Sequence, residues 1–248
     1  MQPNFAEGCG TQGSEQRHRH LRSFIAELAK TASRPLCVVE VGSYTGQSAL
    51  VWREAISKYA PKHLGVVFCV DPWLPYASLE DISSSNTIYR EMNDTLASGR
   101  AYKLFLENTD NRRSLGVPIV PMRMSFAHAA TILDGAHFDL IYIDGSHYYQ
   151  DVKTDIILAR HRLVADGGIL CGDDLELRGS ECDLDIARTL PRTDYAFDTK
   201  AGSFFHPGVT LAVHESFEDE FWSADGVWAV RRKKHPFTAG VWTKEIFT

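Results

Sequence analysis

The sequence has no long apolar run. None of its 248 residues belongs to a stretch near the ~18 apolar residues that a membrane-spanning helix requires, and the N-terminus has no signal-peptide core. We therefore expect no membrane partner and a cytoplasmic location. Basic residues are in the minority, since 26 Lys and Arg stand against 32 Asp and Glu and give a formal net charge of -6. This balance argues against nucleic acid as a partner.

Cysteine is scarce and scattered. The five cysteines form an odd-numbered set without the spacing of a zinc site or a disulfide framework: Cys9, Cys37, Cys69, Cys171 and Cys182. Internal repeats, low-complexity segments and the dinucleotide pattern G-x-G-x-x-G are absent as well. What is present is an ordinary composition, 44% hydrophobic and 23% charged, which excludes a wholly disordered chain and suffices for one α/β domain.

Short apolar runs alternate with amphipathic stretches along the chain. This alternation predicts an α/β fold with a doubly wound, mostly parallel sheet of seven strands and a terminal antiparallel hairpin. The expected strands are Leu36–Val41, Gly65–Val70, Val117–Met122, Phe138–Ile143, Gly168–Cys171, and the two hairpin strands Val209–Val213 and Val227–Arg231. The expected helices are Glu15–Ala32, Gln47–Tyr59, Ser125–Leu133 and Tyr149–Leu163.

Three segments define the expected domain organisation. Residues 1–14 are aperiodic and predict a mobile tail, and residues 15–248 form a single domain. Residues 74–117 are long for a crossover and predict an insertion or lid. Residues 175–207 show no regular pattern. Some side chains in or next to these segments are candidates for an acceptor pocket, for lid packing or for a dimer contact: Trp73, Tyr76, Tyr89, Met92, Arg178, Phe204 and Phe205.

The string Glu40–Ser48, Glu-Val-Gly-Ser-Tyr-Thr-Gly-Gln-Ser, follows the first strand and precedes a helix. A strand, a glycine turn and a helix form the usual cradle for a nucleotide-like ligand, because glycine allows a close approach and the helix N-terminus offers free N–H groups. Tyr44 stands where a dinucleotide motif would have its second glycine. A tight turn between core elements is the alternative explanation.

Polar side chains follow several of the predicted strands. Asp71, Ser125 and Asp144 come at or just after strand ends, and Asp173 and Asp174 follow the fifth strand. Ligands of parallel sheets bind beyond the carboxyl ends of the strands, so we expect these residues to converge on one rim. Asp71 is suited to accept both ribose hydroxyls, or alternatively to start a turn before Pro72.

Three carboxylates belong to adjacent strand ends. Asp144 lies in Ile141–Tyr148, and Asp173 with Asp174 ends Gly167–Asp174. Three carboxylate oxygens on one side of an open site suit a hard divalent cation such as Mg²⁺, which would also relieve their mutual repulsion. Solvated carboxylates that cap turns are the alternative.

With both motifs considered, the chain resembles class I S-adenosylmethionine-dependent methyltransferases across residues 20–232. The pattern E-x-G-x-[YF]-x-G-x-S and the I-D-G-x-H strand end resemble the metal-dependent catechol-type branch and its bacterial sugar O-methyltransferase relatives. The resemblance implies a cosubstrate site at Glu40, Gly42, Ser43, Tyr44, Gly46, Ser48, Asp71, Met124, Ser125 and Asp144. It implies a metal site at Asp144, Asp173 and Asp174, where the catechol enzymes carry Asp, Asp and Asn.

His147 lies three residues after Asp144, where the catechol enzymes have a lysine base, so catechols are doubtful acceptors. We expect His147 and Asp144 to be catalytic, with His147 as the general base or, alternatively, a surface or supporting residue. The predicted function is Mg²⁺-dependent O-methylation of a small molecule, such as a sugar or secondary metabolite, with homo-oligomerisation left open. The alternatives are a metal-dependent hydroxylase-like relative, a nicotinamide-dependent oxidoreductase and a binding protein without turnover.

Overall fold

The computed structural model describes residues 2–10, 13–75, 87–110, 116–134, 137–160, 164–233 and 241–247. Its central sheet has the strand order β10-β9-β5-β4-β1-β2-β3, with β8 paired to β9 outside this path. The inner strands are parallel and the last ones antiparallel, so the predicted fold class is confirmed. The chain divides into two compact units, one of residues 1–36 and 40–125 and the other of residues 37–39 and 126–248, which are described in turn.

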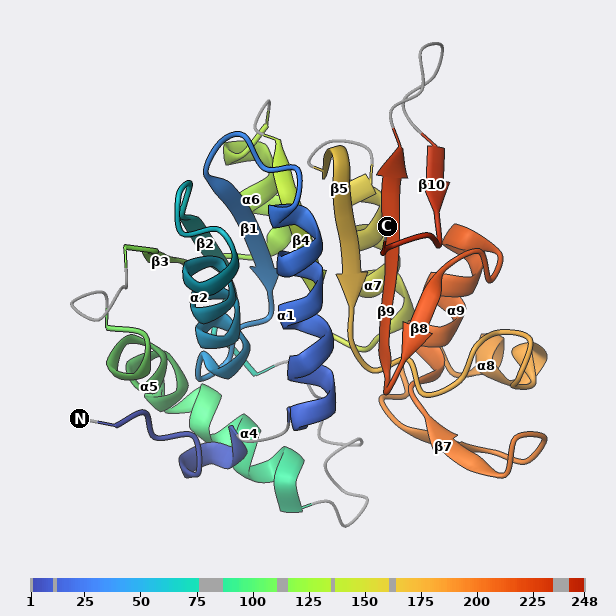
Figure 1. The fold of residues 1–248 in the computed structure, drawn as a ribbon. Coiled ribbons are helices and arrows are strands. Elements are labelled where there is room, and N and C mark those ends of the chain that lie inside the picture. The colour runs from blue at the N-terminus through green and yellow to red at the C-terminus, as the bar shows by residue number, and fades with distance from the viewer. Residues whose placement is uncertain are drawn as a thin grey trace. The chain divides into compact units, whose positions relative to one another are not determined.

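The first unit contains the predicted glycine loop. Its elements are η1 (Glu7–Cys9), α1 (Glu15–Ala29), half of β1 (Leu36–Val41), α2 (Gln47–Tyr59), β2 (Gly65–Val70), α4 (Thr87–Ala97), α5 (Arg100–Asn108) and β3 (Ile119–Met122). Ser14 caps α1 by accepting a hydrogen bond from the Arg17 N–H at 3.2 Å, which satisfies one of the helix's unpaired donors. Helices α1 and α2 pack side by side, as Figure 1 shows.

The second unit contains the predicted acidic strand ends. Its elements are α6 (Phe126–Ile132), β4 (Phe138–Ile143), α7 (Tyr149–Leu158), β5 (Val164–Gly172), α8 (Leu184–Thr189), β6 (Ala196–Asp198), β7 (Ser203–Phe205), α9 (Pro207–Phe217), β8 (Trp222–Ala224), β9 (Val227–Lys233) and β10 (Val241–Thr243). Strand β4 pairs with β5 in parallel, and β9 pairs with β5 antiparallel. In Figure 1, β5 and β9 run beside each other over most of their length.

The predicted strand Val209–Val213 is wrong, because these residues lie in helix α9. All of them are buried, and a short apolar run that is buried on every side gives no periodicity with which to separate a strand from a helix. Pro207 in the first turn favours a helix start at this point. The antiparallel hairpin at the sheet edge is instead made by β9 and β10.

Residues 175–207, which showed no pattern in sequence, contain helix α8 and the hairpin β6–β7. Of the predicted insertion, residues 76–86 and 111–115 lie outside the described residues, as do residues 161–163 of the predicted fourth helix. Among the helices that the structure describes, none has the length and apolarity to cross a membrane. The predicted mobility of residues 1–14 and the predicted single domain stay predictions.

Candidate functional site

The glycine loop of the first unit has a left-handed backbone at three positions. The φ angles are 84° at Gly42, 41° at Tyr44 and 89° at Gly46, which caps helix α2. A Cβ at Gly46 would come within 2.7 Å of the Thr109 side chain, so this position requires glycine on both conformational and steric grounds. The first N–H groups of a helix have no partner within the helix, so the N-terminus of α2 suits an anionic or polar ligand.

Asp71, at the end of β2, fixes the shape of this loop. Its Oδ2 accepts hydrogen bonds from the N–H groups of Ser43 and Tyr44, both at 2.9 Å, and its Oδ1 accepts one from the Trp73 N–H. The Trp73 indole in turn donates to the Tyr44 carbonyl at 2.7 Å. Burial raises the pKa of the Asp71 carboxyl, and these backbone donors oppose the shift. Asp71 therefore has a structural role in the loop, and its predicted contact with ribose stays a prediction.

The N-terminal segment contacts the same loop. The Tyr44 hydroxyl donates a hydrogen bond to the Gly8 carbonyl, and burial raises the pKa of Tyr44 to about 12. The Asn108 side chain donates to the Thr45 carbonyl at 2.9 Å and to the Asn4 carbonyl at 3.0 Å. Residues before helix α1 thus hold the loop through its backbone and through Tyr44.

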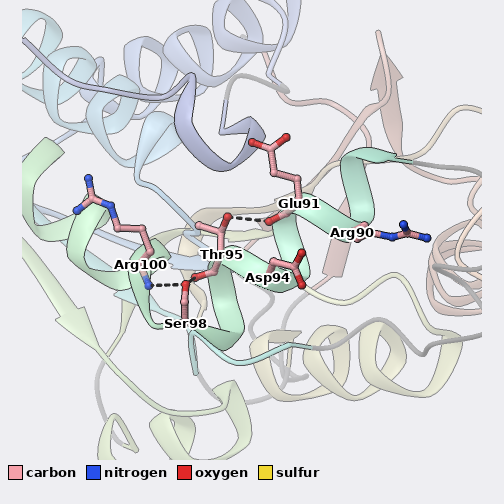
Figure 2. A pocket seen from close by; sticks show the side chains of 6 residues that line it. All are labelled: Arg90, Glu91, Asp94, Thr95, Ser98 and Arg100. Carbon is pink, nitrogen blue, oxygen red and sulfur yellow. Dashed lines mark hydrogen bonds between the residues drawn. The ribbon is translucent and has the colours of Figure 1, made fainter.

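A pocket lies on helices α4 and α5, and Figure 2 shows the side chains that line it. It is lined by Arg90, Glu91, Asp94, Thr95, Ser98 and Arg100. Glu91 accepts a hydrogen bond from the Gly8 N–H at 3.2 Å, and Arg100 pairs with Glu7 at 2.6 Å. None of the predicted site residues lines this pocket, and two of its charged side chains, Glu91 and Arg100, contact the N-terminal segment.

The remaining predicted cosubstrate residues of this unit also lie at the ends of strands or the starts of helices. Ser48 lies in the first turn of α2. Met124 and Ser125 follow β3, and the Met124 N–H donates to the Met122 carbonyl at 2.9 Å. Ser125 is exposed immediately before α6. The contacts of these residues with a cosubstrate stay predictions.

Glu40 is fully buried beneath the glycine loop. Burial raises its pKa to about 7, although the Trp52 indole of α2 donates to its carboxyl group at 2.9 Å. A carboxyl group with this environment is held neutral at mildly acidic pH and becomes charged as the pH passes neutrality.

This buried carboxyl predicts a stability that falls with rising pH. Glu40 ordinarily titrates at 4.5, so its contribution is complete below that pH and is lost as the pH rises to about 7. The loss is at most about 3 kcal/mol, from ~1.4 kcal/mol for each pH unit. Glu40→Gln should flatten this part of the fall in melting temperature measured between pH 5 and pH 8.

Glu54→Gln is the matched control, because Glu54 is exposed on the adjoining helix α2 and its substitution should keep the slope. A smaller slope should remain in Glu40→Gln, since burial also raises the pKa of the partly exposed Asp155 to about 7. A slope in Glu40→Gln equal to that of the unmodified protein would mean that Glu40 is already ionised in the folded state.

The acidic strand ends of the second unit differ in their surroundings. Asp144 directly follows β4 and is partly buried. Asp173 follows β5, and its two oxygens accept hydrogen bonds from the Tyr142 hydroxyl at 3.0 Å and from the Asp174 N–H at 2.9 Å. Asp174 has a φ of 58°, a left-handed backbone that is uncommon outside glycine and often marks a functional position.

His147 lies between two carboxylates. Its Nε2 is 3.0 Å from Asp174 Oδ2, and its Nδ1 is 2.8 Å from Asp194 Oδ1. The His206 ring packs edge-on against the His147 ring, with centroids 4.5 Å apart, and its own Nδ1 is 3.0 Å from Glu176 Oε2. Each imidazole is therefore oriented by a carboxylate at Nδ1.

Helix α9 packs tightly against the His147 loop. A Cβ at Gly208 would come within 2.3 Å of the His147 carbonyl and within 2.5 Å of the Tyr149 N–H nitrogen. Glycine at this position lets the first turn of α9, and His206 directly before it, approach the loop. The mispredicted helix is thus the element that brings the second histidine to the first.

Among the described residues, one group has ligand atoms that all lie within 4.8 Å of one another, and it consists of His147, Asp174 and His206. The predicted trio Asp144, Asp173 and Asp174 is not such a group in the part of the chain described, and its role stays a prediction. Sequence reasoning missed His206, Asp194 and Glu176. The pattern around them is irregular, and the only signal was a histidine next to Pro207-Gly208, a helix-start signature.

Comparison with known proteins now bears on both units. Residues 39–175, more than half of the chain, match the family model described as "Methyltransferase domain". The chain belongs to this methyltransferase family. With its Rossmann-like sheet, it is an S-adenosylmethionine-dependent methyltransferase. No curated protein matches its sequence.

Solved structures share the fold of this methyltransferase at low identity. The O-methyltransferase NovP is 16% identical with a TM-score of 0.54, covering 88% of this chain and 80% of NovP. A calicheamicin methyltransferase is 14% identical with a TM-score of 0.53 and the same coverage. An O-methyltransferase from Bacillus cereus, solved in complex with SAH, is 14% identical with a TM-score of 0.53, covering 89% of this chain and 83% of that one.

Proposed function

We propose that the methyltransferase transfers a methyl group from S-adenosylmethionine to a hydroxyl oxygen of a small molecule, with the help of a divalent cation. The observation that carries the proposal is the glycine loop, whose left-handed turn and α2 N-terminus are held open by Asp71. The neighbours of similar fold described as O-methyltransferases support an oxygen nucleophile.

The cosubstrate is assigned to the first unit and to Asp144. Gly42, Gly46 and the first turn of α2 would receive the polar methionine end, because unpaired N–H groups favour a carboxylate. Asp71 would accept the ribose hydroxyls with lone pairs that the backbone donors leave, and Met124 with Ser125 would flank the adenine. The neutral Glu40 beneath the loop keeps a second negative charge away from Asp71 at mildly acidic pH.

Methyl transfer from a sulfonium is an in-line displacement, so the protein must align the acceptor oxygen and help it lose its proton. A divalent cation supplies charge that favours the deprotonated hydroxyl. The sequence assigns Mg²⁺ to Asp144, Asp173 and Asp174 and the proton to His147. For His147 to act as base, Asp194 would hold Nδ1 while the acceptor replaces Asp174 at Nε2.

An aromatic surface next to the two histidines suits the acceptor. Three rings in or next to the β6–β7 hairpin are about half exposed: Tyr195 at 46%, Phe197 at 50% and Phe204 at 53%. The centroid of the Tyr195 ring lies 4.8 Å from that of His206 and 5.3 Å from that of Phe204. Exposed rings of this kind stack on flat apolar faces such as those of sugars and phenols. Phe205, an expected pocket residue, is instead fully buried, as is Trp73.

Phe204→Ala is therefore expected to raise the KM for the acceptor about 2- to 10-fold, the equivalent of ~0.5–1.5 kcal/mol for one ring contact. The dissociation constant for the cosubstrate should stay unchanged. The measurement is steady-state kinetics at saturating S-adenosylmethionine. Phe247→Ala removes another exposed ring, which packs on Trp222, and should leave KM as it is. An unaltered KM in Phe204→Ala would remove the hairpin from the acceptor site.

The function is tested by supplying a labelled methyl donor with sugar, phenol and small hydroxy-acid acceptors, with and without added divalent cation. We expect label in an O-methyl product and a lower yield in excess chelator. Calorimetry with S-adenosylhomocysteine and with NAD should detect binding of the first alone. Binding of NAD would favour an oxidoreductase, and cosubstrate binding without product from any acceptor would favour a binding protein.

A further inference from the structure

His147, Asp174 and His206, here called the histidine cluster, come from three separate places in the second unit. They follow β4, β5 and β7 in turn, and their ligand atoms all lie within 4.8 Å of one another. All three side chains are largely buried, with 14%, 16% and 8% exposed. A cluster that is drawn from distant parts of the chain and shielded from water has a defined shape before any ligand arrives.

A carboxylate oxygen lies close to each of the two ring nitrogens of His147. A neutral imidazole has one N–H donor and one nitrogen lone pair. With Asp194 at 2.8 Å from Nδ1 and Asp174 at 3.0 Å from Nε2, a neutral ring would turn a lone pair toward a carboxylate oxygen. A metal ion bound between Nε2 and Asp174 would meet the nitrogen lone pair on one side and a carboxylate oxygen on the other.

His206 repeats the same arrangement. Both carboxylate oxygens of Glu176 lie 3.0–3.1 Å from His206 Nδ1. The same carboxylate accepts a hydrogen bond from the backbone N–H of His206 at 3.2 Å. Asp194 and Glu176 thus each hold one imidazole by Nδ1 and leave Nε2 as the other ring nitrogen. Histidines that ligate metals donate their second N–H to a carboxylate or carbonyl in this way, which fixes the tautomer and increases the basicity of the ligand.

We propose that the histidine cluster binds one divalent transition-metal ion of the class that accepts imidazole nitrogen, such as Zn²⁺ or Co²⁺. His147, Asp174 and His206 are its ligands, and Asp194 and Glu176 are positioning residues. Two nitrogens and one oxygen favour such ions over Mg²⁺, which prefers oxygen ligands only. This ion would replace the Mg²⁺ assigned to the three aspartates, because Asp174 is shared, and it would replace His147 as base, because a metal-bound Nε2 cannot accept a proton. Its use in methyl transfer rests on the proposed function, whereas its binding does not.

The distances agree with a shared ion. Two ligand atoms about 2.1 Å from one metal are about 3 Å apart at right angles and about 3.4 Å apart at the tetrahedral angle usual for Zn²⁺. The nitrogen–oxygen distance of His147 and Asp174 is 3.0 Å. Three carboxylates, those of Asp174, Glu176 and Asp194, face two imidazoles in this region, so a divalent cation also offsets an excess of negative charge.

The proposal is tested with untagged full-length protein that has been freed of metal by chelator and dialysis. Zn²⁺, Co²⁺ and Mg²⁺ are titrated separately by calorimetry, and the Co²⁺ complex is examined by its visible absorption. We expect one ion per chain, an absorption band typical of nitrogen ligation, and affinity for Zn²⁺ and Co²⁺ at least roughly 100-fold above that for Mg²⁺. These readouts need no turnover, so they stand or fall separately from methyl transfer.

Variants identify the ligands. His206→Ala should lower Co²⁺ affinity by at least roughly 100-fold and shift the absorption band, whereas Asp194→Asn should weaken it roughly 10- to 100-fold with the band kept. His214→Ala is the matched control, because His214 also pairs with a carboxylate, Asp219 at 3.2 Å, and lies on α9. It should bind Co²⁺ as the unmodified protein does, and circular dichroism checks that each variant folds.

Two results would overturn the proposal. One is preferential Mg²⁺ binding that survives His206→Ala and disappears in Asp144→Asn, because that would assign the ion to the three aspartates. The other is the absence of bound Zn²⁺ and Co²⁺ in a folded protein, because a proton would then lie between His147 and Asp174.

Discussion

His147→Ala is expected to lower kcat by roughly 10²- to 10⁴-fold, the range of a lost general base, and a lost metal ligand should be no milder. His147 is the residue whose two ring nitrogens connect Asp194 and Asp174, so its loss disconnects the cluster in either role. The dissociation constant for S-adenosylhomocysteine should change little, because His147 is not among the residues assigned to the cosubstrate and its ring is held by Asp174 and Asp194. Single-turnover kinetics and calorimetry measure the two effects.

Metal content separates the two roles of His147. A base would leave the bound ion in place and remove a pH-dependent step near the histidine range from the rate profile. If His147 is instead a metal ligand, His147→Ala should also lose the bound ion. His214→Ala again serves as the control and should keep kcat. A kcat in His147→Ala within a few-fold of the unmodified enzyme would exclude both roles.

Asp71→Asn is expected to weaken binding of S-adenosylhomocysteine roughly 10- to 100-fold, from about 1–3 kcal/mol for unsatisfied buried donors. The amide would turn an NH₂ group toward N–H donors that a carboxylate now accepts, those of Ser43 and Tyr44 or of Trp73. The loop would then lose the shape that presents the α2 N-terminus. Calorimetry gives the affinity, and thermal melting gives the accompanying loss of stability.

Asp198→Asn is a fair comparison for this variant. Asp198 is also fully buried and accepts two backbone N–H groups, those of Asp183 and Ala201, but in the second unit. Asp198→Asn should lower the melting temperature and leave the dissociation constant for S-adenosylhomocysteine unchanged. If Asp71→Asn melts earlier but keeps its affinity, Asp71 supports the fold alone and neither the loop geometry nor the ribose contact depends on it.

The parallel strands could be predicted because each is a short apolar run that ends in glycine or a charged residue. The glycine loop could be predicted for a local reason, since Gly42 and Gly46 are needed for a left-handed backbone whatever the distant contacts. Helix α9 could not, because its residues Val209–Val213 are all buried, and the amphipathic signal is lost where a segment is buried on every side.

The partners of His147 could not be predicted from the sequence for a different reason. Asp194 and His206 lie in a region without periodicity, and they approach His147 only because α9 packs against its loop through Gly208. A contact of this kind depends on tertiary packing and leaves no local pattern. The carboxylates at strand ends were visible, but which of them share a ligand was decided by contacts far apart in the chain.

The left-handed backbone of Asp174 limits the amino acids that can occupy this position. With φ at 58°, only glycine, asparagine and aspartate fit without appreciable strain, and a β-branched side chain would distort the turn. Of these three, asparagine keeps an oxygen at the same place with one negative charge fewer. The single substitution Asp174→Asn can therefore change the charge of the histidine cluster by one while the backbone conformation at this position is kept.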